Sequence, residues 1–522
     1  MVLGILGMEF TVFLAMSMFA VFMVLILTGY NVAFSFASTA LAFAFLGDLL
    51  GEFDPLTMNV LPGRWYGALS DQTLLAVPLF VLMGAILERS GLAERLLTAI
   101  GMLMGSLRGG VAAAVVLVGT LMAAATGVVA ATVIVMGILS LPAMIKLGYD
   151  HKLATGVIIA SGTLAQLVPP SLVLILLAQQ LGVGILGLFA GALIPGLILA
   201  AMYAAYALGI SYLKPHMGPA MPREQRTLEG KLSRKSAVII AGLLALLLGM
   251  VSLLLSPGSA LIALVGTFVV LLAILLTGGM LTTEIVVSVV PILVLIVGVL
   301  VSIFQGVATP SESGSVGVFG ALLLTVLNWY FDRLLHRDGA EHITPRWRLT
   351  PTAIYAAGTS TANIVVLVMT LLFSSTFFSL MFFQLGGSDQ TSDWLTAVGG
   401  GKLGFVAVAM VAVFLLGINL EFIEITFIVV PIFVPAMQEL GFTAVEKIWF
   451  AVLMAVNLNM AFISPPVGFS LFYLQSVAPP EVKTADIHKG AFPFMGIQII
   501  FLVILGVFPG ITEFSFRFFS GA

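Results

Sequence analysis

The sequence has no cysteine and very little charge. Without cysteine, its 522 residues cannot form disulfides, iron–sulfur clusters or thiol-based active sites. Charged residues make up 9% of the chain, whereas ordinary soluble domains contain about 25%. The net charge of -3 gives no indication of a nucleic-acid partner. Histidine occurs only in loops and at the ends of apolar segments, which excludes an intramembrane bis-histidine haem and a histidine-dependent hydrolase. The five positions are His151, His216, His336, His342 and His488.

Apolar residues dominate what is present. They make up 60% of the chain, and the mean hydropathy is +1.18. Runs of about 20 apolar residues, the length that a helix needs to cross a bilayer, recur along nearly the whole sequence. We therefore expect an all-α polytopic membrane protein embedded in the lipid bilayer. The first run, residues 8–29, lacks a basic leader and a cleavage site of small residues, so we interpret it as a retained span.

Two basic loops predict the orientation of the chain. Residues 211–236 and 331–348 hold ten of the 21 Lys and Arg residues, so the positive-inside rule places both loops in the cytoplasm. Four apolar segments lie between the loops, and an even number of crossings returns the chain to the same side. The basic residues are Lys214, Arg223, Arg226, Lys231, Arg234, Lys235, Arg333, Arg337, Arg346 and Arg348.

An internal repeat is the most informative pattern. Pro-Ala-Met, Leu-Gly-aromatic and Pro-Pro follow one another in residues 141–170 and again in residues 434–466. The first prolines, Pro142 and Pro435, are 435 − 142 = 293 residues apart. Matches in the same order favour a duplication over the chance recurrence of common apolar motifs. Secondary transporters built from such repeats place their substrate and ion sites where broken helices meet near the membrane midplane.

The two Pro-Pro pairs predict the breaks in these helices. Proline removes a backbone donor and clashes with the preceding turn, so it is costly inside a helix. Unwound backbone at membrane depth is tolerated only where it is buried in protein or lines a polar cavity. We therefore predict that Pro169, Pro170, Pro465 and Pro466 hold the backbone of a binding site open.

Small polar residues precede both pairs at matching positions. Ser161 and Thr163 correspond to Asn457 and Asn459, because 457 − 161 and 459 − 163 both equal 296. Hydroxyl, amide and main-chain oxygens at an unwound turn suit a hard cation such as sodium. We predict these four residues as sodium ligands. For Ser161 and Thr163, ordinary packing between membrane helices is the alternative.

Three carboxylates lie well inside apolar sequence: Glu312, Glu421 and Glu424. A charge in a spanning segment is costly unless it is paired, so each is a functional candidate. Glu421 and Glu424 are three residues apart and share a helix face. We predict Glu421 as an ion ligand and Glu424 as a substrate contact. A position near the membrane surface or against another subunit is the alternative.

Further polar interruptions predict a second break and two re-entrant hairpins. Thr126-Gly127 interrupts an apolar run, and the offset of 293 pairs it with Asn419. We predict all three residues as ion ligands.

We expect the hairpins at residues 71–91 and 302–320. The tip of the second would carry Thr309 as an ion ligand and Ser311 and Glu312 as substrate contacts. An ordinary polar loop between two spans is the alternative for residues 302–320.

Four stretches in chain order resemble the large membrane subunit of tripartite ATP-independent periplasmic (TRAP) transporters. The resemblance covers nearly the whole chain. The stretches are VPLFVLMGAILERSGLAERL, LPAMIKLGYDHKLATGVIIASGTLAQLVPPS, GVATPSESGSVGVFGALL, and VVPIFVPAMQELGF followed by NLNMAFISPPVGFSLF.

The resemblance implies the fold of an elevator-type transporter with two inverted repeats, each with a re-entrant hairpin and a broken helix. It also implies sodium-driven uptake of small organic acids across the bacterial cytoplasmic membrane. A periplasmic binding protein would deliver the substrate, and a small membrane subunit would brace the large one. Because the sequence starts at the first large-subunit span, we expect the small subunit to be a separate chain.

The sequence departs from the family pattern at both expected ion sites. The family usually has Ser-Gly-Ser at the first break and an aspartate soon after, where this chain has Thr126-Gly127-Val128 and Thr132. The family's Gly-x-x-x-Asp becomes Gly417 to Glu421, with Glu424 added. The stretch FIEITFIVVP resembles the branch of the family associated with 2-oxo acids and with aromatic or polyol-type solutes.

These observations predict five regions. Residues 1–70 are N-terminal scaffold helices, 71–212 the first repeat, 213–282 a cytoplasmic loop with extra connecting helices, 283–480 the second repeat, and 481–522 a C-terminal scaffold helix. The function we expect is sodium-coupled import of small organic acids, such as 2-oxo acids, with no enzymatic activity and no cofactor other than sodium ions. A stand-alone ion-coupled carboxylate or anion transporter without a binding protein is the alternative.

Overall fold

The computed structural model describes residues 9–226, 232–255, 260–277, 280–337 and 350–520. Within these ranges the chain is helical and has no strand. Ten of the described helices are long and apolar enough to cross a membrane. The predicted all-α polytopic membrane protein is confirmed.

Two groups of helices lie outside the repeats. The N-terminal group is α1 (Phe10–Leu27), α2 (Val32–Leu50), the 3-10 helix η2 (Pro55–Val60) and α3 (Leu61–Leu69). The connecting group is η4 (Arg223–Arg226), α11 (Arg234–Leu255), α12 (Ala260–Thr277), α13 (Met280–Phe304) and α14 (Pro310–Arg337).

Helices α11 to α14 account for the four apolar segments predicted between the basic loops. Lys231 of the first loop and residues 338–349 of the second lie outside the described residues.

Each repeat is a run of seven α-helices. The first comprises α4 (Gln72–Arg89), α5 (Leu92–Met104), α6 (Gly110–Thr126), α7 (Val129–Lys146), α8 (His151–Thr163) with η3 (Leu164–Gln166), α9 (Leu172–Leu181) and α10 (Ile185–Leu213). The second comprises α15 (Pro351–Gln384), α16 (Gly387–Ala397), α17 (Gly401–Gly417), α18 (Phe422–Glu439), α19 (Ala444–Phe462), α20 (Phe469–Gln475) and α21 (Thr484–Val507), and α22 (Gly510–Ser520) follows.

The helix bounds reproduce the predicted offset, since α18 starts 422 − 129 = 293 residues after α7 and ends 439 − 146 = 293 residues after it.

The two repeats contact each other in a reciprocal pattern. Helix α9 packs on α18 and α19, while its counterpart α20 packs on α7 and α8. Helices α10 and α21 also touch, and the Gln498 Nε2 donates a hydrogen bond of 2.6 Å to the Tyr203 hydroxyl. Such reciprocal packing is what two inverted repeats require, and it confirms the predicted duplication.

The first re-entrant hairpin is α6–α7. Gly119 of α6 packs on Ser161, and Val133 of α7 packs on the adjacent Gly162. In a straight helix, residues 119 and 133 would be about 21 Å apart. They reach neighbouring residues of α8 only because the chain folds back at Gly127, so residues 126–128 form a hairpin tip. The hairpin predicted at residues 71–91 is wrong, since α4 continues as one helix through Pro78 and Gly84.

The second hairpin is α17–α18. The rings of Phe405 and Phe433 meet with centroids 5.7 Å apart, although 28 residues of straight helix would separate them by about 42 Å. The chain therefore turns at residues 418–421. The hairpin predicted at residues 302–320 is wrong, and its alternative is correct. There, α13 and α14 have 25 and 28 residues, each long enough to span, and residues 305–309 connect them.

The broken helices are located where the Pro-Pro pairs predicted them. Helix α8 and η3 end before Pro169-Pro170, and α9 starts after them. In the second repeat, α19 ends before Pro465-Pro466 and α20 starts after them. Both Pro-Pro peptide bonds are cis. The first pair is fully buried, whereas Pro465 is half-buried and Pro466 is exposed.

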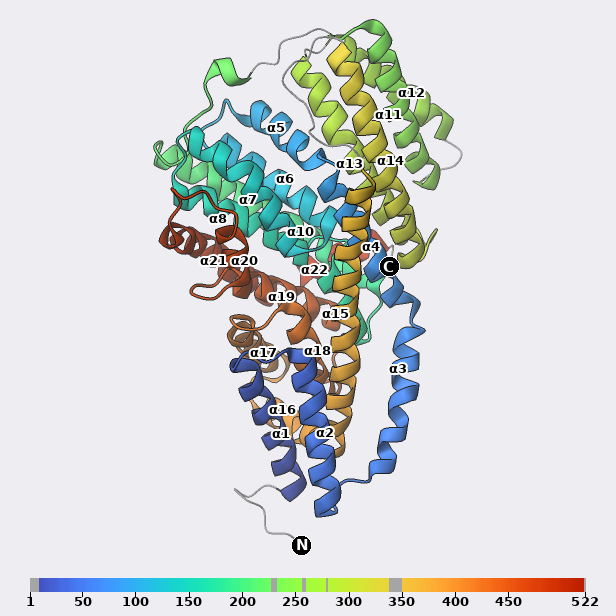
Figure 1. Ribbon diagram of the computed structural model, residues 1–522, viewed down its shortest axis with the longest axis vertical. Coiled ribbons are helices and arrows are strands. Elements are labelled where there is room, and N and C mark those ends of the chain that lie inside the picture. Colours follow the sequence, from blue (N-terminus) through green and yellow to red (C-terminus); the bar gives the residue numbers. More distant parts are fainter. Residues whose placement is uncertain (1–8, 227–231, 256–259, 278–279, 338–349, 521–522) are drawn as a thin grey trace.

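The remaining helices surround these four elements. Figure 1 shows the 34-residue α15 running along the long axis of the molecule. It contacts α2 along part of its length and α4 along another. Helices α11 to α14 gather at the opposite end from α1 and α2 (Figure 1). Many of the outward side chains are large and apolar, such as Phe34, Val24 and Phe319, which suits a surface in contact with lipid.

Candidate functional site

The first hairpin tip is built from neutral oxygens. Gly127 adopts the left-handed conformation, with φ of 62°, which ends α6 and turns the chain into α7. The hydroxyls of Thr126 and Thr132 lie 2.8 Å apart, and Thr132 also donates to the carbonyl of Val128 at 3.0 Å. A Cβ placed on Gly127 would lie 3.2 Å from the carbonyl oxygen of Pro170. The tip therefore touches the Pro-Pro turn of its own repeat.

The second hairpin tip is built from carboxylates. Glu421 is the residue before α18, and its amide donates to the Oε2 of Glu424 at 2.9 Å. The hydroxyl of Tyr473 on α20 donates to the Oε1 of Glu421 at 2.8 Å. Both glutamates are half-buried, and Asn419 is exposed. The second tip thus contacts the helix that follows the second Pro-Pro pair. Tyr473 was not predicted, because a tyrosine in an apolar segment gives no distinctive signal.

The helix ends supply both signs of partial charge at these elements. Helices α6, α8, α17 and α19 end there with carbonyl groups that lack helical partners. Helices α7, α9 and α20 begin there without a side-chain cap, where the helix dipole is positive, whereas the start of α18 is capped by Glu421 and Glu424. Carbonyl ends favour a cation, and amide ends favour an anion. The arrangement can hold a metal cation beside an organic anion.

The four predicted polar ligands before the Pro-Pro pairs fall into two classes. Ser161 and Thr163 are buried, and both hydroxyls donate to carbonyls of their own helix, at 3.2 Å to Ile158 and 2.9 Å to Ala160. Their contacts therefore suit the packing alternative. Asn457 and Asn459 are buried as well, but the Nδ2 of Asn457 donates to Met410 at 2.6 Å, and its Oδ1 accepts no hydrogen bond. Neither side-chain atom of Asn459 has a partner.

Three further polar residues beside the Pro-Pro pairs were missed. Gln166 is fully buried, and both its amide oxygen and its amide nitrogen lack a partner. The hydroxyls of Ser171 and Ser470 are also buried without partners. The elements that carry Gln166 and Asn459, η3 and α19, are in contact.

Five residues beside the Pro-Pro pairs have at least one buried polar atom without a partner, and we call them the inter-repeat polar cluster: Gln166, Ser171, Asn457, Asn459 and Ser470. Leaving a buried polar group unpaired costs about 1–3 kcal/mol, so native proteins satisfy nearly all of them with protein, water or a bound ligand. Seven such atoms lie beside the two Pro-Pro turns, which makes these turns the candidate binding site.

The predicted residues of the α13–α14 turn lie apart from the cluster. The amide and hydroxyl of Thr309 donate to the Oε2 of Glu312 at 2.8 and 2.9 Å, and the Ser311 hydroxyl lies 3.2 Å from that of Thr309. Thr309 and Glu312 are exposed. The three residues cap the start of α14, which packs mainly on α4 and α13. The structure does not bring them to the hairpin tips.

The donor types favour an alkali cation. No three His, Cys, Asp or Glu side chains gather into a group that could hold a metal within the described ranges. The oxygens available at the tips are carbonyls, hydroxyls, amides and the Glu421 carboxylate, and such hard ligands suit sodium better than a transition metal.

The family model described as "Tripartite ATP-independent periplasmic transporter, DctM component" matches residues 19–511. The chain belongs to this family. The predicted TRAP large membrane subunit is confirmed, and the chain is a multi-pass membrane protein of a transporter family, as predicted.

Among its relatives in the DctM family is the C4-dicarboxylate TRAP transporter large permease protein of Pseudomonas aeruginosa. It is 25% identical over 460 residues, which cover 88% of this chain and 90% of the relative. The 2,3-diketo-L-gulonate TRAP transporter large permease protein of Escherichia coli is 23% identical, with 84% of this chain and 85% of the relative covered. In the isethionate TRAP transporter permease protein DctMQ of Oleidesulfovibrio alaskensis, the match covers 84% of this chain and 58% of the relative.

The fold also resembles a solved structure, that of the Alcanivorax borkumensis YdaH transporter. The TM-score is 0.56 at 16% sequence identity, and the alignment covers 86% of this chain and 87% of the other. At this identity the likeness concerns the fold alone.

Proposed function

We propose that the chain is the sodium-coupled permease subunit of a TRAP transporter that imports small organic acids. The observation that carries this proposal is the inter-repeat polar cluster, in which buried oxygens and amides from both repeats have no protein partner. Sodium at the two hairpin tips and an organic anion between them would satisfy these atoms.

Charge provides the coupling in this proposal. Glu421 and Glu424 make the second tip negative, so an organic anion would be repelled from it while it holds no cation. Sodium at Glu421 would remove that repulsion and would bring the carbonyl ends of the helices into one coordination sphere. Sodium thus favours the substrate-competent state through its own interaction free energy, as coupling requires.

Transport would follow an elevator mechanism. The two hairpins and two broken helices are packed on one another through reciprocal contacts, so they can move as one body. The terminal and connecting helices would form the scaffold. The complex would comprise a small membrane subunit, a periplasmic binding protein and this chain in the bacterial cytoplasmic membrane.

The substrate class we favour is a 2-oxo acid or a related carboxylate. Relatives are named for C4-dicarboxylates, sialic acid and 2,3-diketo-L-gulonate, and the last of these is itself a 2-oxo acid. The uncapped starts of α7, α9 and α20 suit the carboxylate of such a substrate.

Reconstituted uptake tests the proposal. The permease and small subunit are incorporated into liposomes, the binding protein is loaded with radiolabelled pyruvate or another 2-oxo acid, and a sodium gradient is imposed. We expect uptake that requires both the gradient and the binding protein. Uptake that persists with potassium in place of sodium would remove the sodium coupling. Equal uptake without the binding protein would favour a stand-alone anion transporter instead.

A further inference from the structure

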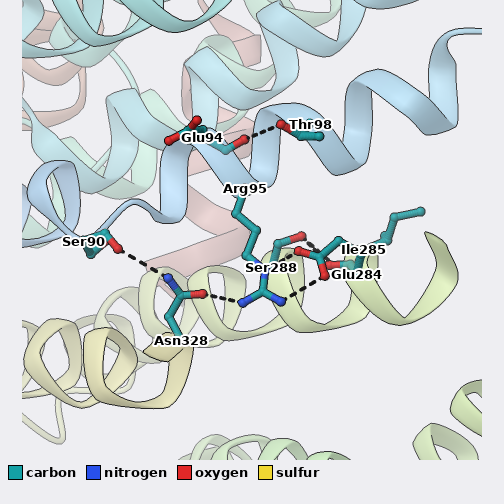
Figure 2. Close-up of polar contacts among 8 residues, drawn as sticks. All are labelled: Ser90, Glu94, Arg95, Thr98, Glu284, Ile285, Ser288 and Asn328. Carbon is teal, nitrogen blue, oxygen red and sulfur yellow. Dashed lines mark hydrogen bonds and ion pairs between the residues drawn. The ribbon is translucent and has the colours of Figure 1, made fainter. Parts of the chain in front are cut away.

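A buried ion pair joins the first repeat to the connecting helices. The guanidinium of Arg95 on α5 binds both carboxylate oxygens of Glu284 on α13, with Nη2 2.9 Å from Oε2 and Nε on Oε1. Its Nη1 donates to the Oδ1 of Asn328 on α14 at 2.7 Å, and the Nδ2 of Asn328 donates to the carbonyl of Ser90 at 3.3 Å. Figure 2 shows Arg95 reaching from α5 to both partner helices.

The pair is more than a surface contact. Arg95 is 2% exposed and Glu284 is 1% exposed. Burying two charges costs solvation that their attraction repays only in good geometry, and apolar replacements of both partners often fold equally well. Such a pair is therefore poor evidence of stabilisation, and its best-attested role elsewhere is to fix one register among several.

The network fixes the corner between α4 and α5, because it holds Ser90 in that corner as well as Arg95. Gly84 lies six residues before Ser90 on α4, about 9 Å along the helix. A Cβ on Gly84 would lie 2.5 Å from the Cα of Thr126 and 2.7 Å from its carbonyl oxygen. Helix α4 thus supports the main chain of the first hairpin tip directly. A shift of α4 along its axis would push the Thr126 carbonyl out of place.

We propose that Arg95, Glu284 and Asn328 are positioning residues for the cation site at the first hairpin tip. The network sets the register of α4 on α13 and α14, and the close packing of Gly84 on Thr126 transmits that register to the main chain of the tip. This inference rests on the proposed function, since it assigns a second layer of residues to the sodium site of that function.

The test replaces both members of the pair with methionine, R95M together with E284M, and measures uptake by the reconstituted complex against sodium concentration. We expect the variant to be extracted as a folded protein. We expect the sodium concentration for half-maximal uptake to rise about fivefold or more, with the maximal rate at saturating sodium nearly unchanged. The charge swap of R95E with E284R should recover part of the loss.

The matched control is R517M together with E513M, which removes an ion pair that is exposed on α22. Its sodium dependence should equal that of the wild type. A folded R95M/E284M variant with wild-type sodium dependence would overturn the proposal and leave the pair a structural feature.

If the R95M/E284M variant does not fold, the sodium dependence of uptake is measured with Asn328→Ala instead. It keeps the ion pair and removes the hydrogen bond to the Ser90 carbonyl, so we expect the same rise in the sodium concentration for half-maximal uptake. An unchanged sodium dependence would overturn the proposal. Uptake by the wild-type complex that is independent of sodium would instead refute the proposed function, regardless of the results with the variants.

Discussion

The two hairpin tips share a backbone frame but differ in chemistry. Both tips join two antiparallel helices, and each touches the Pro-Pro region of its own repeat. The first presents hydroxyls and carbonyls around Thr126, and the second presents the carboxylates of Glu421 and Glu424. The two tips therefore have the same backbone arrangement, whereas the polar groups that their side chains present are different.

This difference assigns separate roles. The cation affinity of a site of neutral oxygens depends on the position of the main chain, because each ligand contributes a dipole whose effect weakens when it is misplaced. A site with a carboxylate depends on charge, because a half-buried anion needs a cation partner. We expect the second tip to dominate sodium affinity and the first to be the more sensitive to backbone register.

The largest effect should come from Glu421→Gln. Removing the charge keeps the size of the side chain and the hydrogen bond from Tyr473, but it removes the attraction for sodium. We expect the sodium concentration for half-maximal uptake to rise tenfold or more, equivalent to about 1.4 kcal/mol of lost binding. The control is Glu446→Gln, which removes a more exposed carboxylate that is paired with Lys402. An unchanged sodium dependence would remove Glu421 from the site.

The next effect concerns two buried amide side chains, one in each repeat. Gln166→Met and Asn459→Leu each replace a buried amide that has no partner with an apolar side chain of similar size. Each should raise the free energy of unfolding without sodium by about 1 kcal/mol and should abolish most uptake, because a buried unpaired group is costly until a ligand satisfies it. Thermal unfolding and uptake are measured on the same preparations.

Asn457→Leu is the matched control for this pair of variants, since Asn457 already donates to Met410. It should bring no gain in stability. Loss of stability in both amide variants would mean that these groups have structural partners and would contradict the binding role.

A smaller effect is expected at the first tip. Thr132→Val removes the hydroxyl that bonds to Thr126 and Val128 and keeps the shape of the side chain. We expect about a threefold rise in the sodium concentration for half-maximal uptake, because the tip loses a hydrogen bond that orders it. Thr132→Ser should restore the wild-type value, and failure of this rescue would assign the effect to packing.

The smallest effect should come from Glu424→Gln. Glutamine serves at the third position of a capping box as glutamate does, so the hydrogen bond to the Glu421 amide persists. We expect uptake within about twofold of the wild type. A loss as large as that of Glu421→Gln would show that both carboxylates bind the cation or substrate and that the second tip is a two-carboxylate site.

The sequence predicted the membrane class, the repeat and the Pro-Pro breaks, because composition and a fixed offset carry them directly. It also singled out Thr126-Gly127 and Asn419, which lie at the observed tips, but interpreted them as a second break and placed the hairpins elsewhere. Pro78 and the Thr309-Pro310 turn suggested tips, yet Pro78 lies inside α4 and Pro310 begins the spanning helix α14. The true tips follow alanine- and glycine-rich helices with no proline at the turn, so contacts such as Phe405 with Phe433 are needed to recognise them as hairpins.

The candidate site was predicted in part. Glu421 and Asn459 stood out because charge and amides are rare in apolar sequence. Ser161 and Thr163 match them in position but bond to their own helix. Tyr473 and Gln166 belong to the site through tertiary packing, which no local pattern expresses. The predicted domain boundaries stay predictions.

The central claim is that the hairpin tips and Pro-Pro turns bind sodium. Thermal unfolding of the purified chain tests it most directly, in sodium chloride and in potassium chloride of equal ionic strength. A ligand that binds only the folded state stabilises it in proportion to the logarithm of its concentration. We expect the unfolding temperature to rise with sodium concentration and not with potassium concentration, and this rise to be largely lost in Glu421→Gln. Identical unfolding temperatures in the two salts across the concentration range would contradict it.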